Sequence, residues 1–179
     1  MFNWLRKSAI DPLAVSMAGI KLADKLLVIG CSDPKLVAAL ASKVGLTGRA
    51  CAVDDDEARV GNAATVAERE GVLIETALAR GTIPYPDDSF DVVVLRAPAP
   101  SFLESARIAE ARRVLRPGGR CVAIVGMARA GARGLLGSRQ PAGTAATMEQ
   151  LLTTASFVAV RTLAERGGLT FHEAVKKNL

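Results

Sequence analysis

The chain has 179 residues, of which 50% are hydrophobic and 23% charged, values that exclude a disordered protein and fit one domain with a sizeable core. The formal net charge of +5 comes from scattered Lys and Arg, so it indicates a solvated basic surface and disfavours nucleic-acid binding. The three cysteines lie in apolar segments without a CxxC pair, which disfavours disulfides and metal sites and is typical of a reduced, cytoplasmic protein.

The chain is expected to form a single domain over residues 1–179, with an N-terminal helical segment at 1–21 and a core at 22–177. The first residues, MFNWLRK, mix apolar and basic side chains. That pattern favours packing against the domain and leaves membrane-surface contact as the alternative. No run of about 18 apolar residues occurs, so no transmembrane helix is predicted.

Short apolar runs alternate with helical patterns along the core. The run 26–30 predicts a buried strand, after which Asp33 and Pro34 supply an N-cap and a first helical residue. The helix that follows is expected to end at Gly45.

A second strand is predicted over 49–53. The acidic run 54–57 then opens a helix, where negative charge suits the helix dipole. Val60, Ala64 and Ala67 are expected on its inner face.

The middle of the core continues the alternation. A short strand is predicted over 72–74, a loop over 79–89 and a strand over 91–95. The S-x-x-E spacing from residue 101 predicts a capping box for a helix that runs to about residue 116.

The C-terminal part predicts one more parallel strand, then a helix, and finally two strands joined as a hairpin. The expected segments are a break at 117–119, a strand at 121–125, a connection at 126–146, a helix capped by Thr147 and Gln150, and strands at 157–163 and 170–175 around Gly167 and Gly168.

Strands that alternate with helices predict a mainly parallel sheet covered on both faces. In such a sheet a ligand binds beyond the carboxyl ends of the strands, where the strand order reverses. This rule selects four loops, at residues 30–34, 54–57, 77–82 and 95–98.

The first two loops carry the strongest candidate residues. Gly30 lets the backbone approach a ligand closely, but GxGxxG and GxxxxGK[ST] are absent, which favours a ligand without phosphates. Asp54, at a strand end, is placed to accept the hydroxyls of a ribose. The alternative is that Asp54 only caps the helix, as Asp55 and Asp56 are expected to do.

The remaining candidates are weaker. Arg96 follows the fourth strand and is expected either to hold a carboxylate in the pocket or to form a surface ion pair. His172 is the only histidine, and its place in the last strand predicts a structural role. No Ser-His-Asp set falls near the four loops, so the catalytic residues are unknown.

Four segments carry a resemblance to a known family. They are LLVIGCSDP at 26–34, GRACAVDDDEA at 48–58, IPYPDDSFDVVVL at 83–95 and EARRVLRPGGRCVAIVG at 110–126. In this order and spacing the chain resembles the class I S-adenosylmethionine (SAM)-dependent methyltransferases, especially the ubiquinone/menaquinone-biosynthesis branch. The closing stretch at 148–177 is similar to the last helix and hairpin of that fold.

The resemblance implies an α/β, Rossmann-like fold with a seven-stranded, mainly parallel sheet, an antiparallel last strand and helices on both faces. It also implies SAM as the cofactor. The implied cofactor-binding residues are Gly30, Cys31 and Ser32 at the methionine moiety, Asp54 at the ribose, Asp55, Ala79 and Arg80 at the adenine, and Leu95 and Arg96 facing the reactive methyl.

The chain departs from the family pattern at four positions. Val28 stands where the family usually has an acidic residue, Ser32 and Pro34 replace two glycines, and Ala79 replaces a frequent Asp. Each hydrogen bond lost to a ligand costs about 0.5–1.5 kcal/mol, so these changes predict weakened SAM binding.

Three functions are therefore expected in decreasing order. The first is SAM-dependent methyl transfer to a small molecule by in-line displacement. The second is a non-catalytic methyltransferase-like scaffold that binds SAM weakly, another nucleoside or a partner protein; a homodimer is a further expected assembly. The third, RNA association through Arg129, Arg133 and Arg139, is disfavoured.

Overall fold

The computed structural model describes residues 12–97, 104–126 and 147–178. The strands are β1 (Lys25–Ile29), β2 (Arg49–Asp54), β3 (Glu75–Leu78), β4 (Phe90–Ala97), β5 (Leu115–Gly126), β6 (Phe157–Arg166) and β7 (Leu169–Lys176). The helices are α1 (Pro12–Ala18), α2 (Pro34–Ala41), the short η1 (Ser42–Val44), α3 (Glu57–Arg69), α4 (Ser105–Val114) and α5 (Met148–Thr154).

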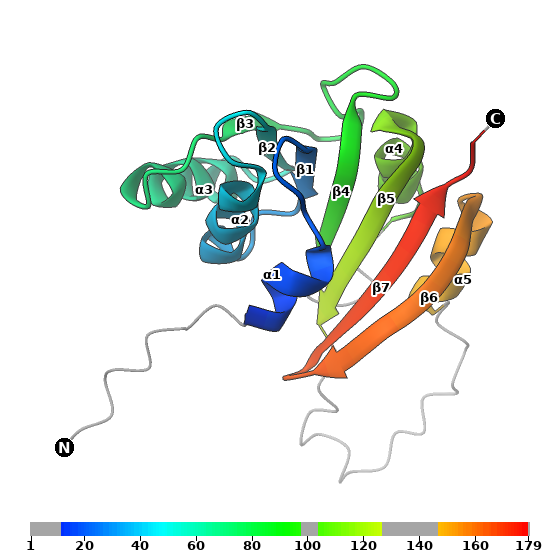
Figure 1. The fold of residues 1–179 in the computed structure, drawn as a ribbon. Helices are drawn as coiled ribbons and strands as arrows, with labels where there is room; N and C mark the ends of the chain where they lie inside the picture. Colours follow the sequence, from blue (N-terminus) through cyan, green and yellow to red (C-terminus); the bar gives the residue numbers. More distant parts are fainter. Residues whose placement is uncertain (1–11, 98–103, 127–146, 179) are drawn as a thin grey trace, which may run out of the picture.

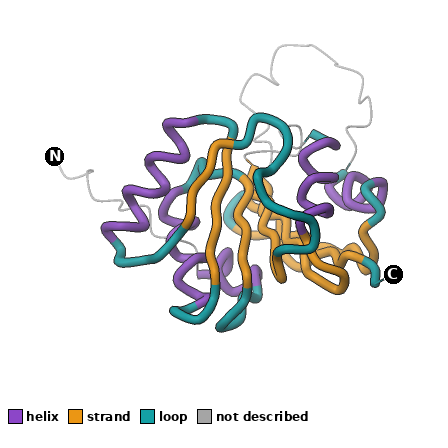
Figure 2. Tube along the Cα trace, turned by 90° about the horizontal axis from the view of Figure 1, so that it is seen from above, coloured by secondary structure: helices purple, strands orange, loops and turns teal. Residues whose placement is uncertain are grey.

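The strands form one seven-stranded sheet in the order β3-β2-β1-β4-β5-β7-β6. Neighbouring strands from β3 to β5 are parallel, whereas β7 runs antiparallel to both β5 and β6. The predicted Rossmann-like sheet with an antiparallel last strand is therefore confirmed. Figures 1 and 2 show the sheet with helices on both of its faces.

Two apolar cores lie on the two faces of the sheet. One packs Leu26 and Val28 of β1 against α1 and α2, and the other packs Leu27 of β1 against α4 and α5. Because the central strands are buried on both faces, they consist of almost continuous Val, Leu and Ile. Among the described residues, no helix is long and apolar enough to cross a membrane.

The predicted starts of α2, α3 and α5 and the terminal hairpin are confirmed. Asp33 accepts a hydrogen bond from Leu36 N at 3.1 Å, and Asp56 caps α3 by accepting from Arg59 N at 3.0 Å. The capping box of Thr147 and Gln150 is present at the start of α5. These local signals fix where the helices begin relative to the carboxyl edge of the sheet.

The prediction of a strand over residues 72–74 is wrong. Val72 N still donates to Ala67 O of α3 at 2.9 Å, and Leu73 is 78% exposed. The third strand begins at Glu75, which pairs with Cys51 in the ladder. The apolar run favoured a strand, but the pairing with β2 selects the next four residues.

The inner face of α3 also differs from the prediction. Ala63 and Ala67 are buried, whereas Val60 and Ala64 are only partly buried. The two buried alanines give α3 an inner face of small side chains, which allows close packing.

The helix predicted from residue 101 begins later. Ser101 lies outside the described residues, α4 starts at Ser105, and its N-cap Glu104 makes no capping hydrogen bond through its side chain. The chain enters β5 directly at Leu115, so Pro117 and the two glycines after it lie inside the strand, not between helix and strand. They form a bulge, because the pairing with β4 jumps from Leu115 to Arg120.

Candidate functional site

The strand order reverses between β1 and β4, so a crevice is expected at the carboxyl ends of these two strands. Gly30 follows β1 with φ +104, and a Cβ atom there would lie 2.1 Å from Arg96 O of β4. The glycine is therefore required by the close approach of the neighbouring strand. Its contact with a ligand stays a prediction.

Asp54 ends β2 and is the best-anchored polar group at this edge. Its side chain is 3% exposed, and Oδ2 accepts a hydrogen bond from Cys31 N at 2.6 Å. Oδ1 accepts from Asp56 N at 3.0 Å and lies 3.1 Å from Arg59 Nε. The structure thus brings Cys31 and Asp54 together, as the sequence predicted, and joins the first two loops through one carboxylate.

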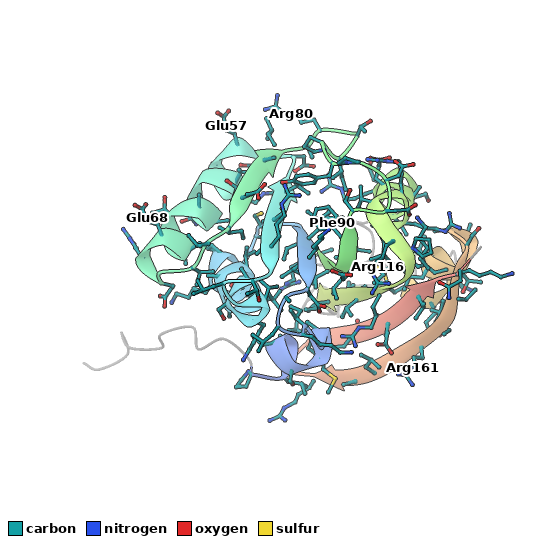
Figure 3. All side chains as sticks on the ribbon, turned by 45° about the horizontal axis from the view of Figure 1, so that its top comes forward. Glu57, Glu68, Arg80, Phe90, Arg116 and Arg161 are labelled. Carbon is teal, nitrogen blue, oxygen red and sulfur yellow. The ribbon has the colours of Figure 1, made fainter. Side chains whose placement is uncertain are left out.

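Asp55 connects α3 with α4. One carboxylate oxygen accepts from Arg59 Nη2 at 3.0 Å and the other from Arg107 Nη2 at 2.9 Å. The backbone oxygen of Asp55 accepts a longer bond from Arg80 Nε at 3.4 Å. Figure 3 shows Arg80 projecting outward, on the same side of the molecule as Glu57 at the start of α3.

A pocket of about 380 Å³ opens beside these ion pairs. Its volume is in the range of small-molecule sites. It is lined by Asp55, Arg80, Gly81, Glu104, Ala106 and Arg107. Two of the predicted site residues, Asp55 and Arg80, therefore line this pocket.

Other predicted site residues point into the core. Leu95 is 0% and Ala79 7% exposed, and both belong to the core between the sheet and α4. Ala79 N donates to Asp54 O at 2.8 Å, so its backbone supports the site. Cys31 is also buried, and burial followed by the charge of Asp54 raises the pKa of its thiol to about 12. Ser32 is exposed next to it.

Arg96 lies at the crevice with an incompletely paired guanidinium. Its Nη1 donates to Ala97 O at 2.6 Å and to Ile124 O at 3.3 Å, while its buried Nε has no hydrogen-bond partner. Burial lowers the pKa of this side chain. No carboxylate of the described residues lies within ion-pair distance of it, so the predicted surface ion pair is not seen there.

Sequence reasoning missed the residues that α3 and α4 contribute. Arg59 lies in the first turn of α3, and its spacing of four from Asp55 was the available signal. Glu104, Ala106 and Arg107 lie at the start of α4, which follows the carboxyl end of β4. The loop rule stopped at residue 98 and therefore excluded them.

His172 lies on β7, outside this cluster. Its Nδ1 is 3.0 Å from Thr162 Oγ1, which itself donates to Glu149 at 2.6 Å. The predicted structural role fits this position between two strands and α5. In the part of the chain that the structure describes, no group of His, Cys, Asp or Glu is arranged to hold a metal ion.

Comparison with known proteins agrees with this fold. A family model described as a methyltransferase domain matches residues 27–123, more than half of the chain, and the chain belongs to this family. A ubiquinone/menaquinone biosynthesis C-methyltransferase, UbiE, of Cupriavidus taiwanensis is 31% identical over 114 residues, 62% of this chain. The match spans 46% of that relative, so the chain covers about half the length of the curated relatives it matches.

Solved structures show the same fold. A SAM-dependent methyltransferase from Aquifex aeolicus has a TM-score of 0.73 at 19% identity, covering 94% of this chain and 95% of that one. The [4+2]-cyclase SpnF has a TM-score of 0.66 at 17% identity, covering 92% of this chain and 78% of that one.

Proposed function

We propose that the chain binds SAM at the carboxyl edge of β1 and β2 and transfers its methyl group to a small molecule. The observation that carries the proposal is the buried carboxylate of Asp54, held against Cys31 N beside a pocket of about 380 Å³. A carboxylate at this strand end suits the two hydroxyls of a ribose, and the pocket suits a planar base.

The residues fit the adenosine end of SAM better than the methionine end. Oδ2 of Asp54 has one hydrogen-bond partner among the described residues and can accept another. Val28 is buried in the core, so the acidic anchor that the family usually has there is missing. We expect binding to be weaker than the resemblance alone implies, by about tenfold for each strong hydrogen bond that the chain does not make to the ligand.

SAM, when bound, supplies a methyl group that is already activated for in-line displacement. The chain then has to position the acceptor and to exclude water. Arg96, half-buried at the crevice, is the group that would orient an acidic acceptor and stabilise its anion. An acceptor already ionised requires no side-chain base. The quinone-biosynthesis C-methyltransferase among the relatives supports a small-molecule acceptor.

A scaffold without catalysis is the second candidate. It is favoured by the ion pair between Asp54 and Arg59, because the carboxylate proposed to bind the ribose already has a charged partner within the chain. A cyclase among the structures with this fold supports the view that the fold alone does not fix the reaction. In this role the chain would bind a nucleoside, a second copy of itself or a partner protein.

Two other expectations lie outside the described residues. They are RNA association through Arg129, Arg133 and Arg139 and membrane contact through the first residues of the chain.

Titration calorimetry with S-adenosylhomocysteine tests the proposed function. The wild-type chain should bind, and Asp54→Asn should bind at least about tenfold more weakly, because a charged acceptor of the ribose is lost. Glu68→Gln on the outer surface of α3 is the matched control and should bind as the wild type does. Absence of binding to the wild type, or equal binding by Asp54→Asn, would leave the scaffold as the function.

A further inference from the structure

Arg59 contacts the carboxylate that the proposed function assigns to the ribose. Its Nε lies 3.1 Å from Asp54 Oδ1, while its backbone N–H donates to Oδ1 of Asp56, the N-cap of α3. Asp54 is 3% exposed and Arg59 is 45% exposed, so Arg59 is the solvent-facing member of this pair.

Both oxygens of the Asp54 carboxylate already have partners within the chain. Ionised carboxylates offer about four lone-pair positions, shared equally by their two oxygens. Oδ1 accepts a hydrogen bond from Asp56 N and lies 3.1 Å from Arg59 Nε in an ion pair, and Oδ2 accepts a hydrogen bond from Cys31 N. A ribose diol that binds both oxygens therefore has to reach Oδ1 beside the guanidinium of Arg59.

Of the three contacts to the Asp54 carboxylate, the ion pair with Arg59 is the one that can be broken when a ligand binds. The two backbone donors are fixed by the loops after β1 and β2, but the guanidinium is carried on a flexible side chain. It also has other partners at hand, with Nη2 lying 3.0 Å from Asp55 and Nε 3.7 Å from Asp56. Arg59 can therefore leave Asp54 and remain paired.

We propose that Arg59 is a specificity-determining residue that competes with the ribose hydroxyls of the ligand for Oδ1 of Asp54. The inference rests on the proposed function, since it assigns the same carboxylate to the ribose. Ligand binding then includes the cost of separating Arg59 from Asp54, with Asp55 and Asp56 as its remaining partners. This competition lowers the affinity for SAM and its product. The absence of the family's polar anchors lowers the same affinity further.

Removal of Arg59 should therefore strengthen binding. In Arg59→Met, a side chain of similar length without donors, S-adenosylhomocysteine should bind roughly three- to tenfold more tightly than in the wild type, the range expected for a partly exposed ion pair. The product is chosen because it lacks the sulfonium charge, so a change in the net charge of the site does not explain the gain. Arg59→Gln provides a second variant should Arg59→Met fold poorly.

Arg69→Met is the matched control, because Arg69 lies in the last turn of the same helix and forms no ion pair among the described residues. Its affinity should equal that of the wild type. Added salt gives a second signature. It screens the Arg59–Asp54 pair, so raising KCl should tighten binding to the wild type and leave Arg59→Met unchanged.

The outcomes separate this inference from the proposed function. Tighter binding by Arg59→Met, with the salt effect confined to the wild type, supports it. If the wild type binds and Arg59→Met binds equally or more weakly, Arg59 orients Asp54 instead and the inference is overturned while the proposed function stands. If none of these proteins binds, the proposed function fails and the inference fails with it.

Discussion

Arg96, at the carboxyl end of β4, and Arg113, in the last turn of α4, have opposite surroundings. Arg96 makes two bonds to backbone carbonyls and leaves its buried Nε without a partner. Arg113 makes hydrogen bonds through all of its guanidinium nitrogens, to Glu110, to Asp87 and to the backbone oxygens of Ile83 and Tyr85. A buried donor left unpaired lowers stability, so Arg96 is better explained by a ligand than by folding.

Arg96→Met should therefore change the free energy of unfolding by less than about 1 kcal/mol, because the lost carbonyl bonds are offset by removal of an unpaired buried donor. Urea denaturation measures this value. Once an acceptor is known, the same variant should lose most of its kcat/KM. A loss of stability well above that limit would show that Arg96 is structural.

For single residues, the sequence predicted the place of a side chain in the fold better than its hydrogen-bond and ion-pair partners. Asp54 was expected at the carboxyl end of β2 because the apolar run before it ends there. Its contact with Arg59 was not predicted, since Asp55 and Asp56 offered the same arginine equally good helical spacings. Similarly, Ala79 was expected at the adenine, but its side chain is buried in the core.

Among the elements, the loop between β3 and β4 is held mainly by α4. Arg113 bonds the backbone oxygens of Ile83 and Tyr85, and Glu110 accepts from Ile83 N at 2.8 Å. Arg80 and Gly81 at the start of this loop line the pocket. The packing of α4 therefore positions one wall of the candidate site.

Arg113→Met should lower the free energy of unfolding by about 2–3 kcal/mol, because it leaves Glu110 and two carbonyls without their partner. Hydrogen exchange at residues 83–89 should become faster, while the strands stay protected. Arg112→Met, one residue earlier on α4, serves as the control, because within the described part of the chain Arg112 makes one hydrogen bond, 3.3 Å long, to Ser156 O. Unchanged exchange in Arg113→Met would mean that another contact holds the loop.

The elements that the sequence misplaced depend on tertiary pairing. Residues 72–74 are more apolar than β3, yet the ion pair of Arg49 with Glu75, 2.6 Å long, accompanies the ladder that starts at Glu75. Periodicity alone does not carry this information. Pro117 predicts a break between two elements. In the structure it lies in a bulge within the long β5, because β5 pairs with β4 both before and after Pro117.

For the whole molecule, the alternation of strands and helices predicted a mainly parallel sheet covered on both faces, and the family resemblance supplied the seven-stranded Rossmann-like arrangement. The right-handed crossover rule leaves few arrangements, and the C-terminal hairpin adds the antiparallel strand. How deeply each ionisable side chain is buried, and therefore how its pKa shifts, was not predictable from the sequence. Burial lowers the pKa of His172 below 6.5 despite the nearby Glu149 and Glu165, and a hydrogen bond from Arg113 lowers the pKa of Glu110 below 4.5.

These shifts predict two steps in the pH dependence of stability. Below 6.5 the unfolded chain binds a proton at His172 that the folded chain resists, so stability falls as the pH falls. Below 4.5 Glu110 acts in the same direction, because its pKa is lower in the folded state. Urea midpoints measured from pH 8 to pH 4 should show both steps, and His172→Gln should lack the first. A midpoint that stays constant from pH 7 to pH 5 would contradict this assignment.

A crystal structure of the chain soaked with S-adenosylhomocysteine tests most directly whether Asp54 binds a ribose. We expect adenosine density with the ribose hydroxyls on Asp54, the base in the pocket lined by Asp55 and Arg107, and Arg59 moved off Oδ1 of Asp54. Density at another place, or a pocket without ligand at saturating concentration with Arg59 still on Asp54, would contradict it.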